Sequence, residues 1–559
     1  MIITVFHFLN ITKSEVEAFP SMLKVFPLYC RLVLKFMEKI ENLKTIKGDA
    51  YDYYAYPSDA DDLFEKIFLV GDIVDAICQP SKIFLIGEKG SGKTAYSVYM
   101  AKKKNSSVKC SISMVNDLLY RKFLNMKRNN ALVLSDMKDI WLVILYLVVA
   151  EKYQETYGKS IFSGMKFKKL KKAIDAFYSD AFKPELVNAF EFVQNASSSI
   201  NLMAAAGVFS SGHESGKETQ EKYVEHSYQI SLLKLQKGFE EAFEELGESN
   251  SYILFIDGID ARPVDIDNKE YFECITGLVN AVLELNRGVL AKKHVKVMPL
   301  MRPDVMYRIP VQNMNQKVRD NSVLLNWDTS YKGYVKSKLF KIAGDYFAKQ
   351  QTEEIDGEKA WDCYFPYKIP HKNRKNAPSY SENAFVEFLR YSSYKPRDIL
   401  TMLNEMVMAT KGSHFSHDDF LGMLNSYFGY LEGELKDYLL IYMTEENYED
   451  FRLFFDYFHG MRDFSYAVFK EKHLEYIHYL KDAGRQIPPE MDTVQRALQL
   501  LYDANVIGYR ETFVAHPGKS EVRVHWSFKE RTYANVRPNV RMNETYMFHL
   551  GYSRAFGIW

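Results

Sequence analysis

Cysteine is sparse in this sequence, and no disulfide or zinc pattern is present. The 559 residues include five cysteines, which lie far apart at Cys30, Cys78, Cys110, Cys274 and Cys363. Their number is odd, and no CxxC pair or Cys/His cluster with metal-ligand spacing occurs. The sequence therefore excludes a disulfide scaffold and a zinc-finger class, and it favours a reducing compartment, the cytoplasm.

Long apolar runs and net charge are also lacking. Residues 140–150 are mostly apolar but too few to span a bilayer, and residues 1–9 lack a basic leader and a cleavage site. Lys+Arg and Asp+Glu both number 72, so no global field attracts the chain to nucleic acid or membrane. We expect a soluble cytoplasmic protein without a membrane partner, in which any nucleic-acid contact comes from a local patch.

Apolar and aromatic residues are plentiful. Hydrophobic residues make up 47% of the chain and aromatic residues 15%, which favours packed cores over disorder. A chain of this length exceeds one compact core, so about two to four domains are expected.

One short stretch carries a specific chemical signal. Residues 83–86 are apolar and predict a buried strand, residues 95–103 predict a helix, and between them lies the pattern G-x-x-x-x-G-K-T. Its glycines allow a tight turn whose N–H groups cradle phosphate, and the helix N-terminus adds positive potential. The expected ligands are ATP and Mg²⁺, with Lys93 on the β- and γ-phosphates and Thr94 on the metal. The residues predicted to bind the nucleotide are Gly87, Glu88, Lys89, Gly90, Ser91, Gly92, Lys93 and Thr94.

A second apolar run ends in acidic residues. Residues 252–256 predict a strand that ends at Asp257, a position from which a carboxylate would hold Mg²⁺. The next residue is Gly258, so the adjacent glutamate of many ATPases is missing. Asp260 is the nearest acid able to orient an attacking water, and the alternative is that it caps a turn or pairs with Arg262.

Further strands complete an expected sheet. Residues 295–301 predict a core strand with Arg302 at its end, where an arginine would sense a γ-phosphate, and residues 323–327 predict another strand. Strands and helices that alternate around a phosphate loop predict a doubly wound α/β domain. In a helical region that follows, Pro396-Arg397 opens a helix.

These stretches resemble the AAA+ and STAND ATPases, including the related KAP-type bacterial group, over about residues 55–410. The resemblance implies a P-loop NTPase core of the ASCE class, with Arg397 as a second sensor on a helical lid. Catalytic roles are expected for Lys93, Asp257, Asp260, Arg302 and Arg397, and metal binding for Thr94 and Asp257. No arginine finger can be picked, so a shared site in a homo-oligomer stays open.

The C-terminal third predicts a winged helix-turn-helix. Residues 464–480 and 493–504 are helical in pattern, and residues 505–512 and 520–528 predict two strands. From residue 460 onward, 14 Lys+Arg stand against 11 Asp+Glu, so the net charge of +3 does not decide whether the module binds DNA or RNA or packs as a regulatory module. The predicted recognition helix carries Arg496 with Asp492 and Asp503, and the best-placed cations are on the wing, at Arg510, Lys519 and Arg523.

The predicted domains are a helical extension (1–48), the ATPase core (49–329) with a helical insertion at about 116–250, a lid (330–433) and the winged helix (434–559). Several alternatives stay open within them. Residues 1–48 form one or two amphipathic helices that lie on a membrane surface or, as favoured, pack on the next domain. Tyr54 or Tyr56 stacks on adenine or is core, and the basic run 166–172 touches phosphates or is a solvated helix face. Residues 414–419 hold a metal or, as favoured, a helix cap at Ser416.

Together these features predict a regulatory switch ATPase that changes conformation with nucleotide state. The resemblance suggests an anti-phage role with an effector or sensor protein as partner. One alternative is an ATP-dependent loader that binds DNA through its winged helix, and another is a scaffold that binds nucleotide without turnover. The missing glutamate after Asp257 favours slow turnover.

Overall fold

The computed structural model divides into two compact units, which are described separately. The larger unit comprises Asp49–Tyr56, Val70–Asn326 and Leu431–Trp559, and the smaller unit comprises Met1–Gly48, Pro57–Leu69 and Trp327–Tyr430. Within them the structure describes residues 37–57, 61–69, 71–103, 107–115, 134–158, 167–176, 233, 235–246, 251–262, 266–310, 313–370, 381–516, 519–533, 535 and 537–559.

A five-stranded sheet forms the centre of the larger unit. Its order is β2-β3-β4-β1-β5, and every pairing is parallel. All residues of β3 and β4 are buried, as expected for a parallel sheet that is covered on both faces. The strands are β1 (Phe84–Ile86), β2 (Lys109–Met114), β3 (Tyr252–Asp257), β4 (Val295–Met301) and β5 (Ser322–Leu324). The predicted α/β fold with a parallel sheet is therefore confirmed.

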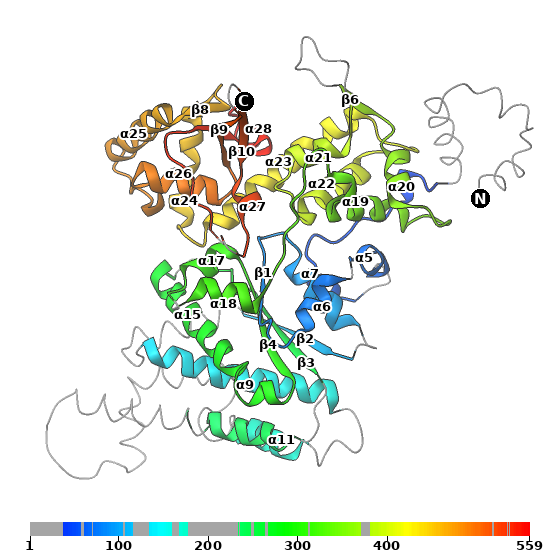
Figure 1. Cartoon of the computed structure of the whole chain (residues 1–559), viewed down its shortest axis with the longest axis vertical. Coiled ribbons are helices and arrows are strands. Elements are labelled where there is room, and N and C mark those ends of the chain that lie inside the picture. Colours follow the sequence, from blue (N-terminus) through cyan, green and yellow to red (C-terminus); the bar gives the residue numbers. More distant parts are fainter. Residues whose placement is uncertain are drawn as a thin grey trace, which may run out of the picture. The chain divides into compact units, whose positions relative to one another are not determined.

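Helices cover both faces of this sheet. The helix α7 (Lys93–Lys102) lies on one face, whereas α9 (Leu134–Tyr157) and α15 (Asn268–Leu285) lie on the other (Figure 1). Connections between parallel strands are right-handed, so the direction in which the chain crosses the sheet decides which face a connecting helix covers. The chain crosses in one direction from β1 to β2, through α7, and in the opposite direction from β2 to β3 and β4, through α9 and α15, so these helices lie on opposite faces. The two helices approach closely at Gly277, where an added Cβ would lie 2.9 Å from the Cβ of Met137.

Apolar length alone would let one described segment cross a membrane. Asn268–Lys292 spans α15 and α16 (Val289–Lys292), and 67% of its most apolar window is buried inside the protein. Its side chains pack in the core of the α/β sheet, for example Val279 and Val282, which are fully buried. The segment is accounted for as a core helix. The other described helices of this region are α4 (Asp52–Ala55), α6 (Asp72–Cys78), α11 (Lys168–Ala176), α17 (Pro303–Arg308) and α18 (Met314–Asn321).

The C-terminal module, residues 431–559, belongs to the larger unit and contains a second sheet. Its four antiparallel strands have the order β10-β9-β11-β8. The strands are β8 (Asp463–Ser465), β9 (Ile507–His516), β10 (Lys519–His525) and β11 (Thr545–Phe548). The helical elements are α24 (Glu445–Arg452), η4 (Leu453–Phe458), α25 (Tyr466–Asp482), η5 (Pro489–Met491), α26 (Val494–Asp503), α27 (Ser527–Glu530) and α28 (Leu550–Ala555). The two predicted helices and the first predicted strand are present, and β8 and β11 add to them. The second predicted strand, 520–528, was too long, because β10 ends at His525 and Ser527–Glu530 form α27.

The smaller unit is helical with one short hairpin. Aromatic side chains fill its core, where Trp361 and Phe365 stack at 4.1 Å between ring centroids. Its elements are η1 (Ile40–Asn42), α5 (Asp61–Ile67), η3 (Tyr334–Lys336), α19 (Lys338–Ala348), α20 (Gly357–Tyr364), β6 (Lys368–Pro370), β7 (Ser381–Asn383), α21 (Phe385–Tyr391), α22 (Pro396–Ala409) and the first part of α23 (His417–Leu439). The hairpin of β6 and β7 was not predicted.

Local contacts bear on two of the open alternatives. Asp419 N donates to Ser416 Oγ (3.2 Å) and Ser416 N donates to Asp419 Oδ2 (2.7 Å), so this stretch is a reciprocal helix cap, as favoured. No group of three potential metal ligands occurs among the described residues. In α11 the lysines are exposed while Leu170 is buried, which agrees with the favoured solvated helix face, and contact of this run with phosphates stays an open alternative.

The helical insertion at about 116–250 is described only in part, by α9, α11 and the helical residues 235–244. The predicted extension 1–48 lies mostly outside the described residues. The four domain boundaries stay a prediction, and the C-terminal module groups with the α/β sheet in one unit.

Candidate functional site

The Gly87–Thr94 loop connects β1 to α7 at the carboxyl edge of the parallel sheet. Gly90 and Gly92 have φ of 81° and 95°, a left-handed backbone that favours glycine. At Gly87 an added Cβ would lie 2.3 Å from the Oγ of Ser91 and 3.1 Å from the Cβ of Leu325, so a side chain there would force its neighbours to move. The helix begins at Lys93, so its N-terminal N–H groups border the loop.

Lys93 curls over the loop that precedes it. Its side chain is buried, and Nζ donates to Gly87 O (2.9 Å) and Glu88 O (3.2 Å). The same Nζ lies 3.9 Å from Oδ2 of Asp260. The structure thus brings Asp260 to the loop lysine, and Arg262, its predicted alternative partner, donates instead to Leu440 O (2.8 Å) and Met443 O (2.8 Å).

Thr94 and Asp257 meet across the sheet edge. Thr94 Oγ1 donates to Asp257 Oδ2 at 2.6 Å, and Gly258 N donates to Asp257 Oδ1 at 2.8 Å. Burial raises the pKa of the Asp257 carboxyl, and the nearby charge of Asp260 raises it further. A buried carboxylate with a raised pKa beside a second acid is an environment that a cation would relieve.

The donor set here fits Mg²⁺. Thr94 offers a hydroxyl oxygen and Asp257 a carboxylate, which are hard oxygen ligands, while Asp260 supplies a second carboxylate nearby. No cysteine or histidine is among these groups, so softer metals are disfavoured.

Gly258 explains the missing glutamate in structural terms. Its φ is 80°, and an added Cβ would lie 2.6 Å from the carbonyl oxygen of Val115 at the end of β2. Any side chain at this position would be strained and would clash with backbone, so the acid of this loop is displaced to Asp260.

Arg302 follows β4 and is buried at 2% exposure. Its Nε and Nη2 donate to the two oxygens of Asp304 (3.0 and 2.6 Å), and its guanidinium lies 4.2 Å from the ring centroid of Tyr438. Burial opposes a charged Asp304, yet the pairing with Arg302 lowers the pKa of that carboxyl below its ordinary value. Arg302 is thus held by protein groups here, and its role as a sensor stays a prediction.

Arg397 lies in the smaller unit, as the second residue of α22. The neighbouring Asp398 is buried and accepts from Ser393 N (2.9 Å) and Tyr430 Oη (3.1 Å), which fixes the start of the helix. The predicted second-sensor role of Arg397 stays a prediction.

Residues of the C-terminal module also reach the loop, and no sequence motif marked them. Glu88 is bound by Arg531 and by Asn505, whose Nδ2 donates to Glu88 Oε2 at 3.0 Å. Lys89 pairs with Glu434 (3.1 Å) and Asp437 (2.5 Å) of α23. The only sequence signal available was the charge of Glu88 and Lys89 themselves.

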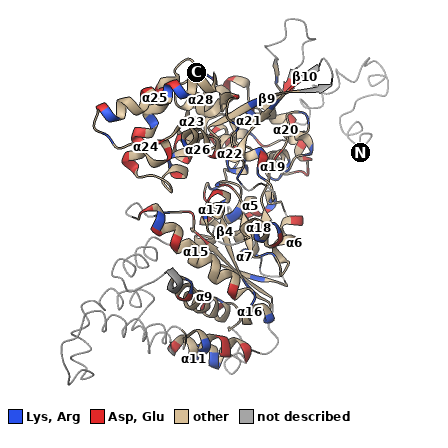
Figure 2. Cartoon of the chain, turned by 60° about the vertical axis from the view of Figure 1, so that its left-hand side comes forward, with Lys and Arg blue, Asp and Glu red and all other residues tan. Residues whose placement is uncertain are grey.

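Three of the four predicted nucleic-acid contacts of the module, Arg496, Arg510 and Arg523, contact other side chains of the module, and the side chain of Lys519 lies outside the description. Arg496 pairs with Asp492 at 2.7 Å and Arg510 with Asp463 at 3.2 Å. The guanidinium of Arg523 lies 5.2 Å from the ring centroid of Phe513. Both signs of charge occur on the helices of this module, with acidic residues predominating on α24 (Figure 2).

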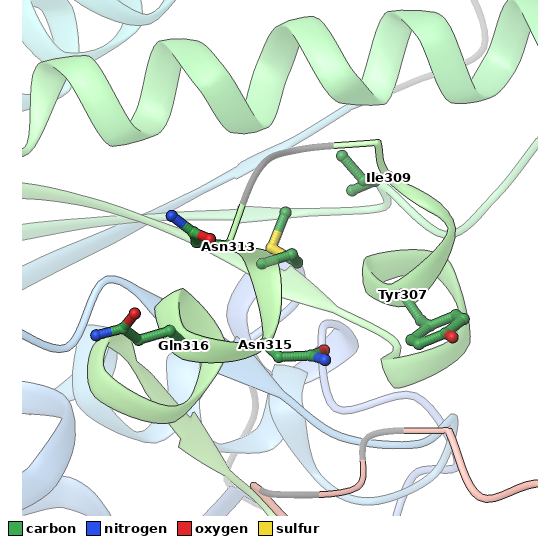
Figure 3. A pocket seen from close by; sticks show the side chains of 6 residues that line it. Tyr307, Ile309, Asn313, Asn315 and Gln316 are labelled. Atoms are coloured by element: carbon green, nitrogen blue, oxygen red, sulfur yellow. The ribbon is translucent and has the colours of Figure 1, made fainter.

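A pocket of about 460 Å³ lies beside α17 and α18 in the larger unit (Figure 3). Among the described residues that line it, amide and phenol groups occur together with apolar side chains, and none is a carboxylate, a lysine or a histidine. Its lining suits the binding of a neutral polar group rather than acid–base chemistry. The lining residues are Tyr307, Ile309, Asn313, Met314, Asn315 and Gln316.

No protein-family model matches this chain, and no curated protein matches it. The parallel sheet with order β2-β3-β4-β1-β5 is consistent with a P-loop-like fold.

Proposed function

We propose that the chain binds Mg·ATP at the Gly87–Thr94 loop and hydrolyses it slowly, as a cytoplasmic switch ATPase of the AAA+/STAND type. One observation carries the proposal. The hydroxyl of Thr94 and the carboxylate of Asp257 lie 2.6 Å apart, at the carboxyl edge of the sheet and beside Lys93. This is the constellation that phosphoryl transfer requires of a protein, a cation for the phosphates and oxygen ligands for the metal.

The residues divide the chemistry between them. The loop N–H groups and Lys93 bind and orient the phosphates, and Thr94 and Asp257 hold Mg²⁺. Asp260, beside Lys93, orients the attacking water and accepts its proton. Bound Mg²⁺ would neutralise charge on the phosphoryl oxygens. Because position 258 carries no acid, only the carboxylate of Asp260, in the turn after β3, positions the water. We therefore expect slow turnover.

Arg302 and Arg397 are proposed to report on the γ-phosphate. Arg302 would do so by exchanging its partner, because both donors of its fork are bound to Asp304 in this structure. Such an exchange would couple the nucleotide state to Tyr438 and to Tyr442, whose hydroxyl donates to Asp304. We propose that this coupling is the conformational switch. We also propose that the switch acts in anti-phage defence, with an effector protein as its partner.

The C-terminal module is proposed to be a winged helix that packs on the ATPase domain. The hairpin of β9 and β10 after α26 supports this interpretation. The internal pairs of Arg496 and Arg510 favour packing over the alternative of a DNA loader. A shift assay with duplex DNA across a salt series separates the two. Binding with a steep salt slope that Arg510→Ala and Arg523→Ala weaken supports the loader.

The test of the proposed activity is release of phosphate from ATP by the full chain. We expect Mg-dependent turnover below about 10 s⁻¹, the median for enzymes, and its loss in Lys93→Ala and Asp260→Asn. Lys292→Ala, which removes an exposed lysine of α16, is the matched control and should hydrolyse as the wild type does. Nucleotide binding without phosphate release would instead identify a scaffold. Equal release by wild type and Lys93→Ala would contradict the assignment.

A further inference from the structure

The Gly87–Thr94 loop carries opposite charges at Glu88 and Lys89, and the C-terminal module binds each of them with groups of the other sign. Glu88 uses both carboxylate oxygens, since Oε1 is paired with Arg531 Nη1 and Oε2 accepts from Asn505. Lys89 Nζ lies between Glu434 and Asp437. Because Glu434 and Asp437 are three residues apart on α23, they share one helix face.

The Arg531–Glu88 pair is buried. Arg531 is 6% exposed, and its Nη2 also donates to the carbonyl oxygen of Asp503 at 2.7 Å. Burial alone would disfavour the charged guanidinium, but the carboxylate of Glu88 raises the pKa of Arg531 above its ordinary value. A buried, hydrogen-bonded pair of this kind is sensitive to the loss of either partner.

The module touches the neighbouring loops as well. Arg262, just after Asp260, caps the turn at Leu440, and Tyr442 Oη donates to Asp304 beside β4. Tyr533 Oη accepts from Leu324 N (2.8 Å) at the edge strand β5. The loops after β1, β3 and β4 therefore all contact residues 431–559.

The charges of these contacts bear on an anionic ligand. A nucleoside triphosphate is strongly negative, so the carboxylate of Glu88 in the phosphate loop opposes its binding and the ammonium of Lys89 favours it. Arg531 cancels the first effect, whereas Glu434 and Asp437 cancel the second. The contact at Glu88 thus favours binding of the anionic ligand, whereas the contact at Lys89 disfavours it.

We propose that Arg531 is a positioning residue for nucleoside triphosphate binding, which neutralises Glu88 and holds the loop in its phosphate-binding shape. The proposal rests on the proposed function, because it names a further residue of the same site. It makes residues 431–559 part of the nucleotide site, although the site residues predicted from the sequence lie between residues 87 and 397.

A double-mutant cycle of Arg531 and Glu88 tests this proposal, with ATP binding to the full chain measured by calorimetry. Arg531→Met should raise the Kd about tenfold, because it leaves a carboxylate uncompensated beside the phosphates. Glu88→Gln should lower the Kd, and the double variant should return it to within about threefold of wild type. Arg531→Lys keeps the charge and should also bind nearly as wild type does. A double variant as weak as Arg531→Met would overturn the inference.

The contact of Lys89 with Glu434 and Asp437 supplies a second test, in which the Kd for ATP should change in the opposite direction. Glu434→Gln with Asp437→Asn frees the charge of Lys89, so the Kd should fall about threefold at low salt and return toward the wild-type value at about 1 M salt. A merely structural contact would weaken binding in both arms. Weaker binding in this variant at low salt therefore counts against the inference.

The controls separate this inference from the proposed function. Arg496→Gln removes an exposed ion pair in the same module and should leave the Kd and the thermal midpoint unchanged. Thermal unfolding without nucleotide shows whether each variant is folded. If Arg531→Met does not fold, the predicted lower Kd of Glu88→Gln still tests the inference. A wild-type chain that binds no ATP overturns both proposals. ATP binding that Lys93→Ala abolishes and Arg531→Met leaves unchanged overturns the role of Arg531 alone.

Discussion

Thr94 Oγ1 donates a hydrogen bond to Asp257 Oδ2 at 2.6 Å, although 163 residues separate the two in the chain. β1 and β3 make this possible, because both are parallel to β4 between them and end at the same edge of the sheet. If these oxygens hold Mg²⁺, the metal should strengthen ATP binding in the wild type. Thr94→Val should lose about tenfold in Mg-dependent affinity, while Thr94→Ser, which keeps the hydroxyl, should retain it. A titration of ATP with and without Mg²⁺ measures this, and a Thr94→Val variant with full Mg dependence would place the metal elsewhere.

Gly258→Ala tests why the acid of this turn lies at position 260. The positive φ and the 2.6 Å approach to Val115 O should cost about 1–3 kcal/mol of the free energy of unfolding. Gly433→Ala is the control, because Gly433 lies in α23 with open space around its added Cβ, and it should be neutral or stabilising. Denaturant unfolding of both variants gives the comparison. Equal stabilities would remove the backbone explanation.

Arg302→Met tests the buried pair beside β4. It leaves the carboxylate of Asp304 buried without its guanidinium, so the free energy of unfolding should fall by about 3–5 kcal/mol. Arg452→Met breaks an exposed pair with Glu432 in the same unit and should cost less than about 1 kcal/mol. The double variant Arg302→Met/Asp304→Asn should recover part of the loss. A loss for Arg302→Met no larger than that for Arg452→Met would show that Arg302 is not structurally committed to Asp304.

Lys296 predicts a pH dependence of stability. This buried lysine of β4 donates to Ile77 O and Gln79 O, and burial lowers its pKa from 10.5 to about 8. Between those values the unfolded chain binds more protons than the folded chain, so the free energy of unfolding should rise with pH, by up to about 3 kcal/mol. Below about pH 8 the lysine is charged in both states and its burial penalty is constant.

Lys296→Met isolates this contribution from that of other groups. Urea unfolding of both proteins between pH 7 and pH 11 should show a rise in the wild type that is smaller in the variant. The difference between the two curves is the readout, because the variant also loses the hydrogen bonds to the end of α6. Parallel curves would contradict the depressed pKa.

The sequence predicted the α/β sheet well because its strands are short apolar runs with polar ends. The loop at Gly87–Thr94 and the strand that ends at Asp257 depend on local residue types, so both could be located before the structure. Even the position of Asp260 near Lys93 was within reach, since only two residues separate it from Asp257.

The contacts of the C-terminal module could not be predicted in this way. Arg531 and Asn505 lie 443 and 417 residues beyond Glu88, and neither belongs to a nucleotide-binding motif. Their placement depends on how α26, α27 and β9 pack against the loops of the sheet, which is a property of the folded chain. The partner of Arg302 was missed for another reason, since Asp304 lies only two residues away and only its buried geometry distinguishes a structural pair from a free sensor.

Calorimetric titration of Mg·ATP into the full chain tests the central claim most directly. The account predicts one saturable site per chain in the wild type and in Lys292→Ala, and no measurable binding in Lys93→Ala with an unchanged thermal midpoint. Binding of equal affinity in Lys93→Ala, or no binding in the folded wild type, would contradict the assignment of the Gly87–Thr94 loop as a nucleotide site.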